Sequence, residues 1–283
     1  EVLEAEPDVI DVPDPFYDFS QYYVARHDKT VVVGWETLPG KAMATKGALG
    51  CIQSAWKFTA HSELAKATLV LDGAVPDKVR VIPGAVNTDI FTPGGGYYER
   101  EAAVLFVGRD AAEKGLSDLI CAMHGLKAEL WVVGHTGNEW CRRLVEHYNV
   151  SVKWIGKVPW RELPKLYQQA RVFCLPSIPL VSNTDPYANW TEQFGQVLIE
   201  AMACGTPIVA TDCGAIPDVL GGCGIYAAPR DWHWLHDGLA QFLYNPGLFE
   251  ETRQMGIERV EKRYTQLVVG KQIVDWYFGG GER

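Results

Sequence analysis

The sequence predicts an α/β protein with two domains built on parallel sheets, and three observations lead to this fold class. The chain has 283 residues, enough for two domains of ordinary size. Short runs rich in valine and isoleucine alternate with longer amphipathic stretches, which is the pattern of β-α-β units. Runs such as VLFV and WVV lack polar alternation, as expected for strands covered by helices on both faces.

Periodicity and turn signals give the order of the elements. We expect strands at 30–33, 79–82, 103–107, 129–133, 152–155, 171–175 and 207–210. We expect helices at 115–126, 139–148, 162–170, 196–204, 216–220, 231–244, 249–264 and 267–278.

Three consecutive glycines after Pro93 suggest a domain boundary, because they remove side-chain constraint between a loop and a new strand. Residues 97–265 then form a complete C-terminal α/β domain, and 266–283 form a helix that packs back on the N-terminal domain. Residues 1–96 show too few strands for a complete Rossmann-like domain. We therefore expect a truncated N-terminal domain, consistent with an acidic start at Glu1 without methionine.

Composition excludes some classes of protein. A formal net charge of −9, without a run of lysine or arginine, argues against a nucleic-acid partner. The seven cysteines include no CxxC pair and mostly lie in apolar patterns, so we expect buried side chains and a reducing compartment rather than a disulfide or zinc site. Since no apolar run could span a bilayer and no signal peptide is visible, we expect a cytoplasmic protein, in solution or peripheral at a membrane.

Two cations follow the predicted strand 103–107. Gly108 and Arg109 end the strand, and Lys114 and Gly115 precede a helix. This arrangement places positive charge and a helix N-terminus at the carboxyl end of a parallel strand, where open α/β sheets bind anions. The alternative is that both cations are solvated loop residues.

Two acids flank the start of the predicted helix 196–204. Glu192 precedes the helix in EQFGQVLIEAMACGTP, and Glu200 lies inside the otherwise apolar helix, where a carboxylate is costly unless it is paired or used. Gly195 would let a ligand approach the backbone N–H groups at the helix start. The alternative places Glu192 at the surface and Glu200 in an ion pair.

In combination these motifs resemble the family 4 glycosyltransferases, which have the GT-B architecture of two Rossmann-like domains facing a cleft. The resemblance covers nearly the whole chain. It includes KFTAHSELAKATL, VRVIPGAVNTDIFTP, VLFVGRDAAEKG, VKWIGKVPWRELPKLYQQARVFCLPS, EQFGQVLIEAMACGTPIVATDCGAIPDVL and GIERVEKRYT. It implies that the family's first strand, with its glycine-rich loop near the acceptor, is missing.

The resemblance implies transfer of a sugar from a nucleotide diphosphate (a UDP- or GDP-sugar) with retention at the anomeric carbon and without a catalytic metal or other cofactor. It implies that Arg109 and Lys114 hold the diphosphate and that Glu200 binds the ribose. Glu192 would face the sugar, as the third catalytic residue. The remaining donor-binding positions would act largely through main chain: Gly108 in the cation loop, Phe194, Gly195 and Gln196 at sugar and phosphate, and Gly156, Lys157 and Val158 at the base.

Three further residues are candidates for the acceptor side. Glu36 stands where many family members have a histidine, and His61 lies on a domain-facing loop by resemblance. Trp190, in the polar stretch 181–190, could stack on carbohydrate. Each has a structural alternative: a surface or structural role for Glu36, an ordinary buried histidine for His61, and core packing for the tryptophan.

The acceptor (a glycan, a lipid or a small molecule) and the donor base are not determined by these motifs. Two other functions share the donor site: a non-catalytic sugar-nucleotide-binding protein and a sugar-nucleotide epimerase. Turnover of donor argues against the first, and product analysis with labelled donor separates the second.

Overall fold

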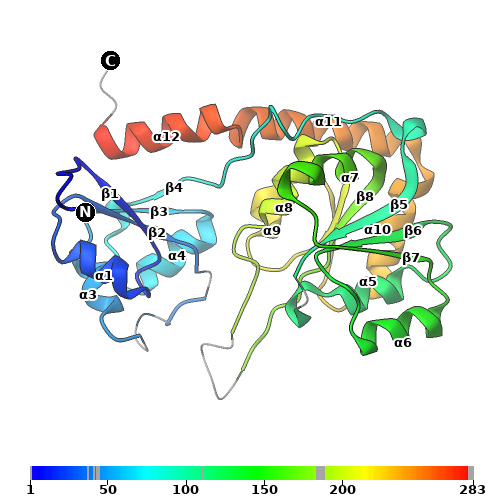
Figure 1. Cartoon of the computed structure of the whole chain (residues 1–283), viewed down its shortest axis with the longest axis horizontal. Helices are drawn as coiled ribbons and strands as arrows, with labels where there is room; N and C mark the ends of the chain where they lie inside the picture. Colours follow the sequence, from blue (N-terminus) through cyan, green and yellow to red (C-terminus); the bar gives the residue numbers. More distant parts are fainter. Residues whose placement is uncertain are drawn as a thin grey trace. The chain divides into compact units, whose positions relative to one another are not determined.

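A computed structural model describes residues 2–36, 38–40, 42, 45–109, 111–182 and 189–279. The chain divides into two compact units (Figure 1). The first unit comprises Glu1–Gly84, Leu180–Phe194 and Leu267–Arg283, and the second comprises Ala85–Pro179 and Gly195–Gln266. The glycines at 94–96 lie inside the second unit, since Gly94 N–H donates to Cys204 O (3.0 Å) and Arg253 donates to Gly94 O (2.8 Å).

The first unit contains a four-stranded parallel sheet in the order β1-β2-β3-β4. The strands are β1 (Ile10–Pro13), β2 (Thr30–Gly34), β3 (Lys57–Ala60) and β4 (Val79–Val81). The sequence predicted β2 and β4 but missed β1 and β3. Both missed strands have only four residues and include polar positions, Asp11 in β1 and Lys57 and Thr59 in β3. The sequence therefore contains no apolar run that would predict them.

Among the described residues, three helices cover one face of this sheet with a core that includes Val12, Val32 and Phe58. They are α1 (Asp18–Val24), α3 (Ala48–Ser54) and α4 (Glu63–Leu71), and a short 3₁₀ turn η1 spans Pro76–Lys78. None of them was predicted. The clearest missed signal is at α4, where Ser62 Oγ accepts from Ala65 N–H (3.1 Å) as an N-cap.

Helix α12 (Gln266–Phe278) contributes aromatic side chains to the first unit. Trp276 donates its indole N–H to Phe58 O (3.0 Å), and Lys57 Nζ donates to Trp276 O (2.5 Å). The same ammonium lies over the rings of Trp56 and Trp276, at 4.3 and 4.6 Å from their centroids. These contacts tie the end of the chain to β3.

The second unit contains a six-stranded parallel sheet in the order β10-β9-β8-β5-β6-β7. Its strands are β5 (Glu101–Val107), β6 (Glu129–Val133), β7 (Val152–Gly156), β8 (Ala170–Leu175), β9 (Ile208–Thr211) and β10 (Ile225–Ala227). All were predicted except β10, which has only three residues. The chain proceeds from β5 to β7 in one direction and then returns to the other side of β5, so strand order reverses between β5 and β8.

Helices and 3₁₀ turns surround this sheet (Figure 1). All predicted helices are present. Helix α5 ends earlier than expected, and α11 begins earlier, with Pro246 as its first residue and the Asn245 side chain accepting from Leu248 N–H as N-cap. The bounds are α5 (Leu116–Ala122), α6 (Glu139–Tyr148), α7 (Leu163–Gln169), α8 (Gln196–Ala203), α9 (Ile216–Leu220), α10 (Trp232–Tyr244), α11 (Pro246–Arg263), η2 (Tyr97–Glu99), η3 (Ala112–Lys114) and η4 (Trp160–Glu162).

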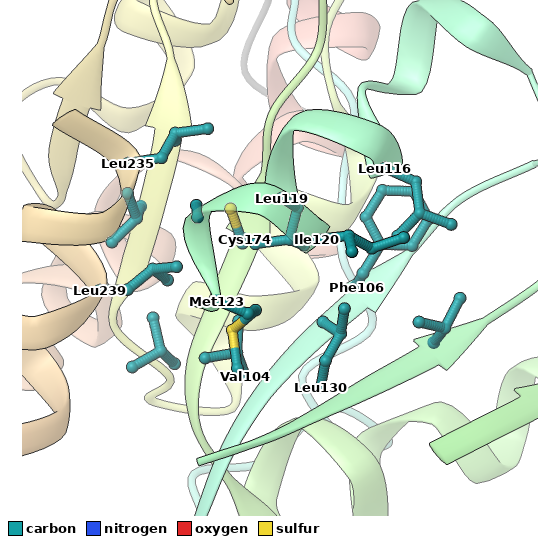
Figure 2. Packing of buried hydrophobic residues seen from close by; sticks show 14 of the residues in the cluster. Val104, Phe106, Leu116, Leu119, Ile120, Met123, Leu130, Cys174, Leu235 and Leu239 are labelled. Carbon is teal, nitrogen blue, oxygen red and sulfur yellow. The ribbon is translucent and has the colours of Figure 1, made fainter. Parts of the chain in front are cut away.

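The hydrophobic core of the second unit includes a cluster between the sheet and helices α5 and α10, as Figure 2 shows. Leu119 and Ile120 of α5 and Leu239 of α10 are fully buried together with Val104 of β5. At about 25 cal/mol per Å² of apolar surface, such burial is the main stabilising term of the second unit. Six of the seven cysteines are buried and Cys121 is half-buried, so the prediction that most cysteine side chains are buried is confirmed.

Candidate functional site

The reversal of strand order between β5 and β8 places a candidate site in the second unit. In open α/β sheets, ligands bind outside the carboxyl ends of the strands at such a switch point. Two segments start from these strand ends: the loop Gly108–Gly115 after β5, and the chain after β8 that leads to α8. Both carry residues that the sequence indicated.

The loop after β5 presents the two predicted cations. Arg109 has a side chain that is 73% exposed and forms an ion pair with Glu113 at 3.2 Å. Lys114 is half-buried and ends the 3₁₀ turn η3. An exposed ion pair contributes little to stability, so the Arg109–Glu113 contact leaves the guanidinium able to exchange its partner for an anion.

Gly115 joins this loop to the segment after β8. Its φ is +68°, and a Cβ placed there would lie 1.8 Å from Pro176 O. Nearby, Ile178 N–H donates to Glu113 O at 2.8 Å. Only glycine satisfies both the left-handed backbone and this close approach, so the position of Lys114 depends on Gly115.

We expect Gly115→Ala to lower the free energy of unfolding by about 2 kcal/mol or more, because strain and a backbone clash act together. Gly125→Ala is the matched control: Gly125 has a φ of +77° with no atom within 4 Å of its would-be Cβ. Thermal denaturation should show a clearly larger loss for Gly115→Ala. Equal losses in the two variants would contradict the close approach to Pro176.

Helix α8 begins at the other side of the switch point. Its N-cap, Gly195, has a φ of +79° and no side-chain cap, so the first backbone N–H groups have no capping side chain. Gln196 is exposed and donates its side-chain amide to Ala85 O at 2.9 Å. An N-terminus of this kind favours a negatively charged ligand through its aligned N–H groups.

Glu200 lies one turn into α8 and is only 4% exposed. Its two carboxylate oxygens each accept one hydrogen bond, Oε1 from the Trp160 indole N–H at 3.3 Å and Oε2 from the Tyr167 hydroxyl at 3.1 Å. Burial raises the pKa of Glu200 above its ordinary value, while these two donors act in the opposite direction. The sequence predicted that this carboxylate is paired or takes part in binding, but it did not indicate either hydrogen-bond donor.

The carboxyl ends of β6 and β7 complete this edge of the sheet. Gly134, after β6, donates its N–H to Gly156 O at 2.7 Å, and a Cβ at Gly134 would lie 2.4 Å from Gly108 O. Gly156 has a φ of +74°, and it is followed by the exposed Lys157 and the half-buried Val158. The structure thus places Gly156–Val158 at the same sheet edge as Gly108.

The predicted acceptor-side residues belong to the first unit. Glu36 is 8% exposed and follows β2, while His61 follows the neighbouring strand β3. The His61 ring contacts Trp35 (6.1 Å between centroids) and Phe194 (5.8 Å). His61 is half-buried, and burial lowers its pKa. The structure therefore gathers these residues at one edge of the four-stranded sheet.

Glu192 and Trp190 also belong to the first unit. Glu192 is 6% exposed, which excludes the surface alternative weighed from the sequence. Trp190 is half-buried and pairs with Leu180 in an isolated antiparallel bridge. Most of the polar stretch before Trp190, residues 183–188, lies outside the described residues.

Among the residues that the structure describes, no helix has both the length and the apolar character needed to cross a membrane. The same part of the chain holds no group of three or more His, Cys, Asp or Glu side chains arranged to hold a metal ion.

The family model described as "Glycosyl transferases group 1" matches residues 89–263, more than half of the 283-residue chain. The chain belongs to this family. This group 1 glycosyl transferase is 35% identical over 211 residues to phosphatidyl-myo-inositol mannosyltransferase of Mycobacterium leprae, a match covering 69% of this chain and 52% of the relative. It is 27% identical over 261 residues to an uncharacterized glycosyltransferase of Methanocaldococcus jannaschii, a match covering 84% of this chain and 63% of the relative.

The chain spans about half the length of the first of these curated relatives. Among solved structures, the sucrose-phosphate synthase of Thermosynechococcus elongatus has a TM-score of 0.76 at 21% identity, covering 95% of this chain and 73% of that one. HepE of Anabaena in complex with UDP has a TM-score of 0.79 at 15% identity, and the match covers 97% of this chain and 80% of the HepE chain. These neighbours confirm the α/β fold of the GT-B type for this group 1 glycosyl transferase.

Proposed function

We propose that this group 1 glycosyl transferase moves a hexosyl group from a nucleotide-diphosphate sugar to an acceptor, with retention at the anomeric carbon. One observation supports this most strongly. The cation loop after β5, the uncapped start of α8 and the buried carboxylate of Glu200 all belong to the carboxyl side of one strand-order switch in the second unit. An anion site next to an acceptor of hydroxyl protons suits a nucleoside diphosphate.

In this proposal Arg109 and Lys114 bind the diphosphate and stabilise the negative charge that develops as the sugar departs. Preorganised positive charge at a leaving group is commonly the largest catalytic contribution. The N–H groups at the start of α8 add to the same stabilisation. The two cations would serve where other enzymes use a metal ion, so no cofactor is proposed.

The remaining predicted residues take roles around the donor. Glu200 binds the ribose, and Gly156, Lys157 and Val158 meet the base largely through main chain. Glu192 and Phe194 bind the donor sugar, and Glu36, His61 and Trp190 serve the acceptor side.

The names of similar proteins narrow the donors to be tested first. The Anabaena neighbour was solved with UDP and with UDP-glucose. Several relatives are named mannosyltransferases, including those of Mycobacterium leprae and Mycolicibacterium hassiacum. We therefore propose a UDP- or GDP-hexose as donor, with mannose and glucose as the first sugars to test and a hydroxyl group of a glycan, lipid or small molecule as acceptor.

A thermal-shift screen of UDP-glucose, UDP-galactose and GDP-mannose tests the donor site. A ligand at 100 times its Kd stabilises a protein by about 2.7 kcal/mol, so we expect one nucleotide sugar to raise the Tm by several degrees. Release of nucleoside diphosphate then separates an enzyme from a binding-only protein, and NMR of the product sugar shows retention or inversion. A screen in which no nucleotide sugar or nucleoside diphosphate stabilises the chain would refute the proposal.

Glu200→Gln should weaken nucleoside diphosphate binding by about 10-fold or more, because charge-assisted hydrogen bonds are stronger than neutral ones. In the wild type, affinity should fall as the pH decreases toward the raised pKa of Glu200, since the protonated group accepts less well. Without ligand, Glu200→Gln should be more stable than the wild type at about pH 8. A carboxyl group whose pKa is raised on folding lowers the free energy of unfolding of the protein as the pH rises, and the variant lacks this group. Calorimetry and melting from about pH 8 to about pH 5 check both effects. A pH dependence of binding that Glu200→Gln retains would contradict the assignment.

A further inference from the structure

The carboxylate of Glu200 is held by two side chains that no motif identified. Trp160 and Tyr167 donate to different oxygens of the same group, across 40 and 33 residues of sequence. Both donors belong to the second unit, as does Glu200. The carboxylate therefore has a defined orientation before any ligand is present.

We infer that Trp160 and Tyr167 are positioning residues, which orient Glu200 to accept both hydroxyl groups of a cis-diol, the 2′- and 3′-hydroxyls of a ribonucleotide. This inference rests on the proposed function, in which Glu200 meets the ribose. It adds two residues to the donor site and a specific selectivity, for ribonucleoside over dideoxyribonucleoside diphosphates.

The number of acceptor sites on a carboxylate supports this selectivity. An ionised carboxylate has about four lone-pair sites, two on each oxygen. Since each oxygen of Glu200 accepts one protein donor, one site per oxygen is left. Two adjacent hydroxyl groups supply two further donors, one for each oxygen, and a dideoxyribose supplies none.

The packing of the two donors explains why their positions are stable. The Phe91 ring, 1% exposed, lies 5.2 Å from that of Trp160 and 6.2 Å from that of Tyr167. Tyr167 also packs on Phe173 at 5.4 Å and is fully buried. Burial, followed by the nearby Glu200, raises the pKa of Tyr167, so its hydroxyl stays protonated and remains a donor.

Trp160 is the better residue to test. It is 46% exposed, so replacing its ring removes less core packing than a change at Tyr167 would. Trp160→Phe keeps an aromatic ring for contact with Phe91 and removes the indole N–H. We therefore expect Trp160→Phe to remove the hydrogen bond to Glu200 with little loss of protein stability.

Calorimetry of the full chain with UDP, GDP and their 2′,3′-dideoxy analogues tests the inference. For the ribonucleotide that binds, we expect Trp160→Phe to weaken affinity by about 5- to 10-fold, less than the loss of a direct hydrogen bond to a charged group would cost, because Trp160 acts through Glu200. Binding of the dideoxy analogue should change less than about 2-fold, because that ligand does not use Glu200. Tyr167→Phe should reduce the same selectivity.

Trp234→Phe is the matched control. Trp234 is 55% exposed on α10, and its indole N–H donates to Tyr226 O at 2.8 Å, away from Glu200. We expect unchanged affinity for all four ligands. Equal loss of ribonucleotide and dideoxy affinity in Trp160→Phe would overturn the inference, because it would show a base contact or a structural effect. Tighter ribonucleotide binding would overturn it too, because Trp160 would then compete with the ribose.

Glu200→Gln distinguishes this failure from failure of the proposed function. If that variant keeps the wild-type preference for ribose, Glu200 does not meet the ribose, and the assignment of the donor site is wrong. If Glu200→Gln loses the preference and Trp160→Phe retains it, the donor site stands and the positioning role fails. A wild-type chain that binds neither UDP nor GDP overturns both.

Discussion

Arg109→Ala combined with Lys114→Ala is expected to reduce turnover of a nucleotide sugar by about 10³-fold or more, with the fold intact. Removing a single preorganised charge-stabilising group commonly costs about 10²- to 10³-fold in kcat, and this variant removes two from one loop. Affinity for the nucleoside diphosphate should fall as well, since each cation supplies a charge-assisted bond to phosphate. Initial rates of diphosphate release and calorimetry measure the two effects.

A charge-matched control is available on the surface of the second unit. Arg143 and Lys262 are exposed, at 69% and 72%, and each forms an ion pair with a glutamate four residues away. Arg143→Ala with Lys262→Ala removes the same charge and should leave turnover and affinity unchanged. Wild-type affinity for every nucleotide sugar in the Arg109/Lys114 variant would show that the diphosphate binds elsewhere.

Arg100→Met is expected to lower the free energy of unfolding of the second unit by about 3 kcal/mol or more, because several buried acceptors lose their donor. Arg100 is 4% exposed, and burial lowers its pKa to about 10, so it remains charged at neutral pH. Its guanidinium donates at 2.8 to 3.0 Å to carbonyl oxygens of Gly95, Tyr167, Ala170, Cys204 and Gly205 and to Thr206 Oγ1.

These acceptors lie in three segments: the loop with the glycines at 94–96, the end of α7 with the start of β8, and the segment that follows α8. One side chain therefore connects three segments through hydrogen bonds. A loss of 3 kcal/mol corresponds to a Tm decrease of roughly 6–12 °C for a unit of this size. The exposed Arg143→Met serves as control and should melt within about 2 °C of the wild type. A comparably small change in Arg100→Met would mean that water satisfies the freed carbonyl groups.

Local signals explain which elements could be predicted. The bounds of β6 and α6 match the prediction because both are marked locally: β6 ends at a glycine, and the Asn138 side chain caps α6 at Cys141 N–H. Strands β1, β3 and β10 were missed because segments of three or four residues are too short to carry a periodic signal. Pairing with neighbouring strands stabilises them, and such pairing joins residues far apart in the chain.

The candidate site divides in the same way. Arg109, Lys114 and Gly195 could be proposed from the sequence because cations and a helix start after strands indicate an anion site, and Glu200 because a carboxylate inside an apolar helix needs a partner. The roles of Trp160 and Arg100 were not predicted, since their hydrogen-bond partners include atoms 40 and 106 residues away in sequence. Nothing adjacent to either residue indicates that partner.

Residue types and local spacing were enough to predict the family, the order of the longer elements and the motifs proposed to bind the donor. The folded structure was needed to identify which donors hold the Glu200 carboxylate and why Gly115 must be glycine, at its approach to Pro176. The physical reason is that hydrogen bonds and close backbone contacts form between segments that the fold brings together, and their energy depends on distances of a few tenths of an ångström.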